Sequence, residues 1–395
     1  MTQNGKSRSF AYDTRYFLIS QTDPETGLTT YGRDEVGNMT SKKVGAAAAV
    51  SFGYDGLNRL ASVSYADGDT IARSYFKDDK LQSVSNGAAS RSYLYDGNKN
   101  LTSESLTVGT GPGAQTLGVT YAYNGNDALS SLTYSSGASV TYNPDGFGRP
   151  TTASPYVTAI AYHPSGAMSS MTYANGVQTT VGLNDRLWPS TLQIGKSSSP
   201  LMFDKQYFYD GVGNVNVIND YASNTGRQMT YDNIDRLVTA KGPWNGLYKA
   251  SYDGRGNITR QGWTDANNVE YFSRAYTYDA GSDLLTQMVE TGGSGATYNY
   301  TYDARGNVTA KGALALGYTD ASTMRCSNCG APAEATYAYD GANMRVSTVK
   351  SGATTYFMYG SAGNLLWEQT PGATAKQYIY VGGKQVATHE KPLSP

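Results

Sequence analysis

One short phrase recurs about every 21 residues along nearly the whole chain, from Tyr12 to Tyr380. Tyrosine and aspartate close an aromatic stretch, a turn with Gly or Asn follows, and Arg or Asn precedes the next apolar residue. The complete copies are YDGLNRL from Tyr54, YDGVGNV from Tyr209, YDNIDRL from Tyr231, YDGRGNI from Tyr252, YDARGNV from Tyr302 and YDGANMRV from Tyr339. With weaker copies the total is about 18, and a fixed period of roughly 20 to 50 residues is typical of arrays of supersecondary elements. The repeat therefore predicts a single array over residues 1–395, although the length alone suggests two or three domains.

Composition indicates that the repeats are built from β-strands. The chain has 34 Tyr against 9 Phe and 4 Trp, together with 45 Gly. Tyr and Thr suit a half-buried pleated surface, and Gly, Asn and Asp suit the turns between short strands. Charged residues make up 16% and the net charge is −1, so the basic surface of a nucleic-acid-binding protein is missing. We therefore expect an all-β protein with no nucleic-acid partner.

Each repeat predicts a strand that ends at its tyrosine. Tyrosines recur at alternate positions before the turn, as at Tyr207 and Tyr209, which places their rings on one face of a strand. The Asp that follows can accept a hydrogen bond from a backbone N–H two residues on, and Gly or Asn tolerates the positive φ of a tight reversal. We predict a structural and not a catalytic role for these turn residues. They include Asp55, Asp210, Asp232, Asp253, Gly256, Asn257, Asp303, Gly306, Asn307 and Asp340.

A second reversal about ten residues later completes a hairpin in several repeats, as in YADGDT from Tyr65 and YANGVQ from Tyr173. Two strands per repeat give about 36 strands, and open twisted sheets rarely exceed about 10 strands before they curl or close. At about 4.8 Å per strand the sheet extends roughly 170 Å, enough for about one turn of a roll about 55 Å across. We therefore expect an antiparallel sheet of many hairpins rolled into a hollow spiral shell, which in this chain is incomplete. Unpaired strands in the copies of Tyr12 and Tyr380 would favour self-association through sheet edges.

The sequence lacks the signals of several other classes of protein. No apolar run approaches the roughly 18 to 20 residues that span a bilayer, and the first residues lack the apolar core of a secretory signal. Histidine chemistry has only His163 and His389 to draw on, and no GxSxG, HExxH or phosphate-loop motif occurs. We expect no enzymatic activity and no cofactor.

Cys326 and Cys329, in MRCSNCG, are the one local feature outside the repeat. A CxxC pair can be half of a zinc site or a redox pair, but no second CxxC or neighbouring His pair accompanies this one. Two loop cysteines or a local disulfide are the favoured interpretation, and zinc shared between two chains is the alternative. We therefore predict no metal site, with these two residues as the only candidates.

The phrase Tyr-Asp-x-x-Gly-Asn-Leu/Val, repeated at this spacing, resembles the YD repeats of the RHS family. That family includes bacterial Rhs and wall-associated proteins, the C component of Tc toxins and the YD shell of animal teneurins. The resemblance implies a hollow β-shell which, in the toxin members, encloses a C-terminal toxic domain until delivery. Three further parts of family members do not appear in this sequence: the N-terminal plug domain, the closing segment with its self-cleaving aspartates, and the C-terminal toxin domain.

The resemblance implies a function in toxin encapsulation. We expect a non-catalytic structural shell segment that encloses or presents a C-terminal toxin or effector domain of a longer or neighbouring polypeptide. The expected location is secreted or at the cell surface, although no signal peptide is visible. The alternative is a cell-surface adhesion or carbohydrate-binding module, because exposed tyrosine rings stack on sugars. Packing between successive coils is the other use of the same tyrosine face.

Overall fold

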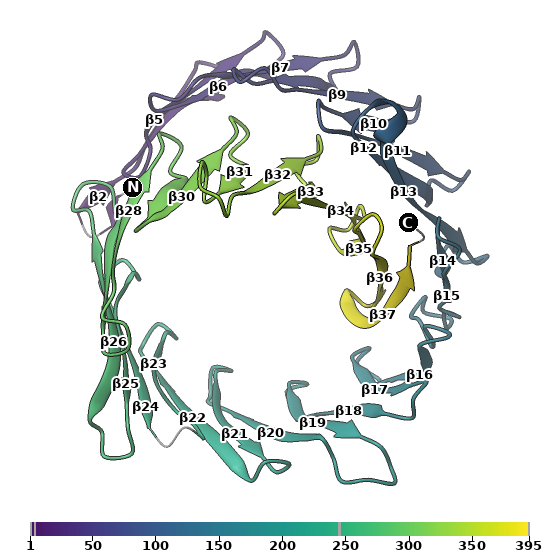
Figure 1. The fold of residues 1–395 in the computed structure, drawn as a ribbon, viewed down its shortest axis with the longest axis vertical. Coiled ribbons are helices and arrows are strands. Elements are labelled where there is room, and N and C mark those ends of the chain that lie inside the picture. Colours follow the sequence, from purple (N-terminus) through teal and green to yellow (C-terminus); the bar gives the residue numbers. More distant parts are fainter. Residues whose placement is uncertain (1, 4, 244–245, 394–395) are drawn as a thin grey trace. The chain divides into compact units, whose positions relative to one another are not determined.

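The computed structural model describes residues 2–3, 5–243 and 246–393. Within them the chain forms 37 β-strands and one short 3-10 helix, η1 (Gly111–Gly113). Every strand pairing is antiparallel and joins strands that are consecutive in the chain (Figure 1). The prediction of an all-β protein built from an antiparallel sheet of many hairpins is confirmed. Across the described residues, no helix has the length and apolar character of a membrane span.

The strands form two large sheets and one short ribbon. The ribbon pairs β1 (Thr2–Gln3) with β2 (Lys6–Ser7). The first large sheet has 13 strands: β3 (Ser9–Tyr12), β4 (Leu18–Asp23), β5 (Gly27–Arg33), β6 (Met39–Val44), β7 (Val50–Tyr54), β8 (Leu60–Ser64), β9 (Thr70–Tyr75), β10 (Leu81–Ser85), β11 (Ala89–Tyr95), β12 (Leu101–Val108), β13 (Gln115–Tyr123), β14 (Leu129–Tyr134) and β15 (Ser139–Thr141).

The second large sheet has 22 strands, and β37 is at one of its edges just as β3 is at an edge of the first sheet. Its strands are β16 (Val157–Tyr162), β17 (Met168–Tyr173), β18 (Gln178–Leu183), β19 (Pro189–Gly195), β20 (Phe203–Tyr209), β21 (Val215–Asp220), β22 (Thr225–Tyr231), β23 (Leu237–Lys241), β24 (Leu247–Tyr252), β25 (Ile258–Thr264), β26 (Glu270–Tyr278), β27 (Leu285–Thr291), β28 (Thr297–Tyr302), β29 (Val308–Lys311), β30 (Leu314–Tyr318), β31 (Met324–Ser327), β32 (Ala335–Tyr339), β33 (Arg345–Lys350), β34 (Ala353–Tyr359), β35 (Leu365–Gln369), β36 (Thr374–Val381) and β37 (Lys384–Pro392).

The tyrosine of the repeat marks both a strand end and a β-bulge. Strand β7 ends at Tyr54, which pairs with Leu60, whereas the preceding Gly53 pairs with Ser62. One residue of the partner strand is therefore unpaired, and such a bulge bends the strand and increases its local twist. The same shift occurs at the repeat tyrosine of β20, β24 and β28. Successive hairpins therefore join with the same local irregularity.

The chain divides into two compact units. Unit 1 comprises residues 1–141, 280–284 and 300–395, and unit 2 comprises residues 142–279 and 285–299. Each unit is built from the same repeat, but the two bury their apolar side chains differently.

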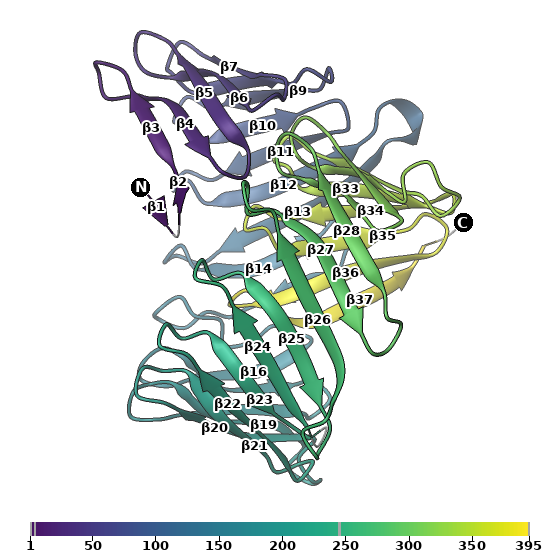
Figure 2. The same cartoon turned by 90° about the vertical axis from the view of Figure 1, so that its left-hand side faces the viewer.

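Unit 1 has two layers, since strands β9 to β14 lie against strands β32 to β37 in both views (Figures 1 and 2). The Tyr134 hydroxyl donates a hydrogen bond to the Tyr378 carbonyl over 2.7 Å, and Asn86 Nδ2 donates to the Tyr339 carbonyl over 3.0 Å. The core lies between the layers. Its side chains are at most 1% exposed at Val84, Leu106, Leu117, Val346, Met358 and Ile379.

Unit 2 contains strands β16 to β27, and the main contacts of each strand are with its two neighbours in the sheet. Its strands contain mostly half-buried and exposed residues, with a few buried side chains such as Ile160, Met171 and Met288. Among the largest side chains that are almost completely buried, Val157 alone belongs to unit 2. Unit 2 therefore depends on contacts between neighbouring strands more than on an internal core.

Candidate functional site

The turn aspartates organise their own loops. In the turn after β7, Asp55 Oδ1 accepts hydrogen bonds from the backbone N–H of Leu57, over 2.9 Å, and of Arg59, over 3.0 Å. These bonds, led by the one from the Arg59 backbone, lower the pKa of the Asp55 carboxyl. The same pair of bonds, to the second and fourth residues after the aspartate, occurs at Asp210, Asp232, Asp253, Asp303 and Asp340. Each predicted turn aspartate therefore acts as a backbone cap.

The third residue after the aspartate has a positive φ. Gly256 and Gly306 occupy this position with φ of +96° and +82°. Asn58 and Asn343 take it in their own repeats, each with φ of +60°. Only Gly, and less readily Asn or Asp, adopts this left-handed conformation without strain. By contrast, the Gly that directly follows the aspartate, such as Gly56, is absent from the positive-φ residues of the described chain.

The fourth residue after the aspartate bridges neighbouring repeats. Arg236 Nε donates to Asp232 Oδ2 over 2.6 Å, its Nη1 donates to the Asp253 carbonyl over 3.1 Å, and its guanidinium lies 4.4 Å from the centre of the Tyr252 ring. Where the repeat has Asn, the amide performs the same task. Asn214 Nδ2 donates to Asp210 Oδ2 over 3.0 Å and to Asp235 Oδ1 over 2.8 Å. The choice of Arg or Asn at this position therefore has a physical reason, a side chain that reaches two turns.

Asn257 and Asn307 make the equivalent bond within their own turns. Asn257 Nδ2 donates to Asp253 Oδ2 over 3.0 Å, and Asn307 Nδ2 donates to Asp303 Oδ2 over 2.8 Å. Asn307 also reaches Ser322 Oγ over 3.2 Å in the following repeat.

The tyrosine hydroxyl provides a second bridge, which the sequence reasoning missed. The Tyr75 hydroxyl donates over 2.8 Å to the carbonyl of Leu60, the first residue of β8 in the preceding repeat. The same bond, over 2.6 to 3.0 Å, joins Tyr54 to Met39, Tyr123 to Leu101, Tyr162 to Pro150, Tyr209 to Pro189, Tyr231 to Val215, Tyr252 to Leu237, Tyr278 to Ile258 and Tyr380 to Leu365. The available signal was the excess of 34 Tyr over 9 Phe, because a hydrophobic face alone would accept either residue.

A buried charge cluster connects the two layers of unit 1. Arg91, on β11, pairs through Nε with Asp340 Oδ2, and its Nη1 donates to the Tyr359 carbonyl over 2.6 Å. Glu104 Oε2, on β12, lies 3.9 Å from Arg91 Nη1. The side chains of Arg91, Glu104 and Asp340 are 3%, 1% and 0% exposed. Asp340 therefore differs from the other turn aspartates, because its partner comes from the opposite layer.

Glu104 also binds a turn that lacks the aspartate of the repeat. The repeat that begins at Tyr359 has Gly360 where the others have Asp, and the Glu104 carboxylate accepts a hydrogen bond from the Ser361 backbone N–H over 3.1 Å. The Tyr121 hydroxyl donates to the same carboxylate. Burial raises the pKa of the Glu104 carboxyl, and these hydrogen bonds and Arg91 oppose that shift. A side chain from one layer thus binds the backbone of a turn in the other.

Cys326 and Cys329 are joined by a disulfide, one of the structures that the sequence left open. Their sulfur atoms lie near a carboxylate oxygen of Glu334, but sulfurs bonded to each other are not thiolate ligands. His163 occupies the aspartate position of its turn, and its Nε2 lies 2.8 Å from the Val181 carbonyl. Cys326, Cys329 and His163 therefore make structural contacts in the described part of the chain.

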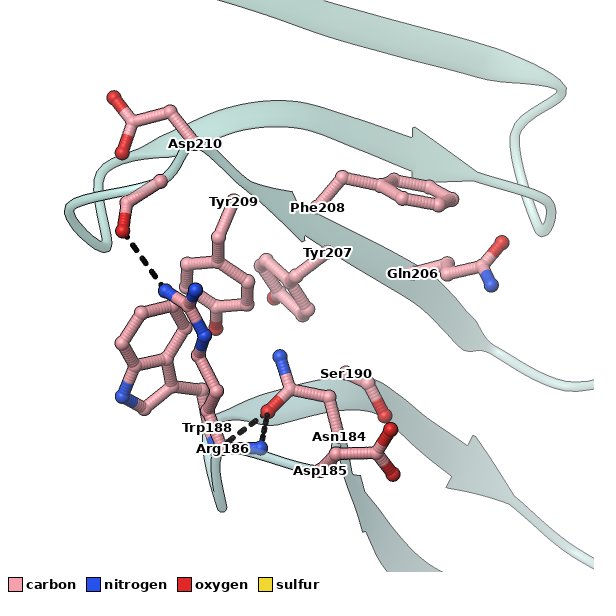
Figure 3. Close-up of a pocket in the computed structure, with 11 residues that line it drawn as sticks. Asn184, Asp185, Arg186, Trp188, Ser190, Gln206, Tyr207, Phe208, Tyr209 and Asp210 are labelled. Atoms are coloured by element: carbon pink, nitrogen blue, oxygen red, sulfur yellow. Dashed lines mark hydrogen bonds between the residues drawn. The ribbon is translucent and has the colours of Figure 1, made fainter.

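The most irregular repeat lines a pocket of about 560 Å³ in unit 2 (Figure 3). Leu183 and Asn184 replace the Tyr-Asp pair there, and Leu187 has the positive φ, +62°, while being 61% exposed. A bulky residue in this conformation is strained. The Trp188 and Tyr209 rings lie 5.1 Å apart, and the Arg186 guanidinium lies 5.1 Å from the Trp188 ring. Aromatic rings with a polar border form this pocket.

Comparisons with known proteins give structural relatives. No protein-family model and no curated protein sequence matches the chain. The Photorhabdus luminescens Tc holotoxin pore matches 99% of this chain with a TM-score of 0.62 and 15% identity. The TcdB2-TccC3-Cdc42 structure matches 98% with a TM-score of 0.61 and 15% identity, and TcdB2-TccC3 matches 97% with 0.58 and 15%.

The chain shares its fold with a segment of these Tc toxin chains. In all three the match spans 24% of the toxin chain, so the likeness concerns about a quarter of that chain. At this level of identity the likeness shows the fold, and the YD-repeat resemblance in the sequence agrees with it.

Proposed function

We propose that the chain is a non-catalytic wall segment of an RHS-like, YD-repeat shell that encloses or presents a C-terminal toxin or effector domain of a longer or neighbouring polypeptide. The observation that carries the proposal is the fold match over 99% of the chain to a Tc toxin structure. In this proposal residues 1–395 form one continuous array, and the assembly is secreted or displayed at the cell surface. The edge strands β3 and β37 are where further strands, or a second copy, would join.

The use of the polar residues supports a structural function. The turn aspartates cap their own loops, and the Arg, Asn and Tyr side chains join one repeat to the next.

A passenger protein tests enclosure. A small, protease-sensitive reporter enzyme is fused after the last residue of the full chain, with a specific cleavage site at the junction. We expect the fused reporter to resist a general protease and to show little activity until the wall is unfolded. The matched control carries the same reporter fused to a flexible linker that contains no copy of the repeat and is as long as the chain. Equal cleavage rates and equal activity in the two fusions would overturn enclosure.

A carbohydrate-binding module is the second candidate function. The pocket with Trp188 and Tyr209 favours it, because aromatic faces beside polar groups suit sugar rings (Figure 3). A panel of immobilised glycans tests it, with Trp188→Ala as the pocket variant. Phe147→Ala, at an exposed turn of unit 2 where the side chain is 85% exposed, is the control. Binding that Trp188→Ala removes and Phe147→Ala retains would support this candidate, and the absence of glycan binding would eliminate it.

A further inference from the structure

A second pocket lies in unit 1, on strands β31 to β35, with a volume of about 450 Å³. Arg345, Thr348, Lys350 and Glu368 are among the residues that line it. Tyr337 and Thr348 are directly paired across β32 and β33, which places them on the same face of the sheet. None of these residues contributes to the charge cluster between the layers.

Arg345 is available to this pocket because its repeat has one extra residue between the aspartate and the arginine. In YDGANMRV, Met344 takes the fourth position after Asp340, where Arg59 and Arg236 bind their own turn aspartates. Asp340 instead pairs with Arg91 from the opposite layer. The Arg345 guanidinium therefore has no turn carboxylate to bind, and it lies 4.5 Å from the centre of the Phe357 ring.

Two cations in this pocket have no anionic partner. Within the described part of the chain, neither Arg345 nor Lys350 forms an ion pair. Arg345 Nε and Thr348 Oγ1 are both buried and lack a hydrogen-bond partner among the described residues. A buried polar group without a partner is costly, and an uncompensated charge more so. Groups of this kind favour a ligand that accepts hydrogen bonds and is negatively charged.

We propose that this pocket binds an oxyanion, a carboxylate or phosphate group, at Arg345 and Thr348, with Lys350 adding a positive charge. A planar guanidinium can make two parallel hydrogen bonds to such a group, and that of Arg345 lies beside the Phe357 ring. The Glu368 carboxylate accepts a hydrogen bond from the Tyr378 hydroxyl over 3.0 Å and would repel the ligand. Since Glu368 is paired with Phe357 across β34 and β35, this repulsion acts close to Arg345.

Titration of the full chain with inorganic phosphate and, separately, with glutarate tests the site, at constant ionic strength and with calorimetric detection. We expect saturable binding of at least one of them, with an affinity that Arg345→Gln lowers by about tenfold or more. Lys350→Gln should lower the affinity less, and since Lys350 is exposed this variant keeps the fold. Glu368→Gln should raise the affinity, because it removes the like charge.

Arg325→Gln is the matched control, since Arg325 is exposed on β31 and does not line the pocket. It makes the same change of charge and should leave the affinity unchanged. Binding of phosphate alone, or of glutarate alone, would identify the group recognised and support the site. The proposal is overturned if neither anion binds saturably, or if binding survives in a folded Arg345→Gln variant.

Discussion

Units 1 and 2 are made from one repeat but are stabilised in different ways. In both, the turn aspartate, the Arg or Asn bridge and the tyrosine hydroxyl join neighbouring hairpins. Unit 1 adds a second layer, and with one exception the largest almost completely buried side chains belong to it. The comparison teaches that the repeat is sufficient to build the sheet, whereas a closed core requires two layers of it.

The repeat departs from its own pattern where the layers of unit 1 meet. A Cβ atom at Gly341 would lie 2.6 Å from Val84 Cγ2, so the layers approach too closely there for any side chain. Gly360 stands where other repeats have the turn aspartate, and the Glu104 carboxylate from the other layer accepts a hydrogen bond from the Ser361 N–H of this turn. These changes accompany the packing of one sheet on another, whereas the main contacts of the described strands of unit 2 are with their neighbours in the same sheet.

Asp340→Ala should produce the largest difference between the units. It removes the closest ion partner of the buried Arg91 and leaves only Glu104, 3.9 Å away, and breaking a buried ion pair costs about 3–5 kcal/mol of the free energy of unfolding. Asp232→Ala, the same change at a partly exposed turn of unit 2, should cost much less. Urea unfolding, monitored by hydrogen exchange in each unit, measures the loss of stability in both variants. Equal losses in the two variants would contradict the distinct role of the cluster.

Restoring the repeat's aspartate in unit 1 should destabilise the protein. In Gly360→Asp the new Cβ would lie 2.7 Å from Leu366 Cδ1 and 3.1 Å from Glu104 Oε1, and overpacking alone costs about 1–3 kcal/mol. Asn124→Asp makes the same restoration at an uncrowded turn, where Asn124 Oδ1 already accepts the two turn hydrogen bonds, and should be tolerated. Thermal melting compares them. Addition of Glu104→Gln should recover part of the loss, because it removes the like charge, and a stabilised Gly360→Asp would contradict crowding of this turn by Leu366 and Glu104.

Turn strain should be the same in both units. Gly256 belongs to unit 2 and Gly306 to unit 1, and both have a positive φ. Valine in this conformation should cost at least about 1–2 kcal/mol, because its Cβ approaches the following carbonyl oxygen. Asn at the same positions should cost less. Thermal melting of the four variants measures the effect, and unchanged melting of both valine variants would contradict the turn assignment.

Loss of one tyrosine hydroxyl should have the smallest effect and should also be equal in the two units. Tyr75→Phe in unit 1 and Tyr252→Phe in unit 2 each remove a 2.8 Å hydrogen bond to a backbone carbonyl. The expected loss is about 0.5–1.5 kcal/mol in each variant. Tyr16→Phe, where the side chain is 88% exposed, is the control. If chemical denaturation detects no loss beyond that control, the hydroxyl bridge does not stabilise the array.

The sequence predicted the local structure because the residues that determine each strand and turn lie within a single repeat. Strands ending at Tyr54 and Tyr252, turns at the following aspartates and two strands per repeat all follow from residues close in the chain. The packing of one sheet on another could not be predicted in this way. Arg91 and Asp340 are 249 positions apart, and nothing in the repeat specifies which copies will face each other. The tyrosine hydroxyl bridge was missed because a pattern of apolar alternation does not distinguish Tyr from Phe.

Solution X-ray scattering of the purified chain, with an independent measurement of its mass, tests the central claim most directly. A compact domain of 395 residues has a radius of gyration of about 21 Å. A wall segment of a shell predicts a monomer with a clearly larger radius of gyration. Its pair-distance distribution should have a maximum shifted toward long distances, as a particle with a hollow centre gives. A solid monomer with the compact radius would contradict the shell and favour the carbohydrate-binding module.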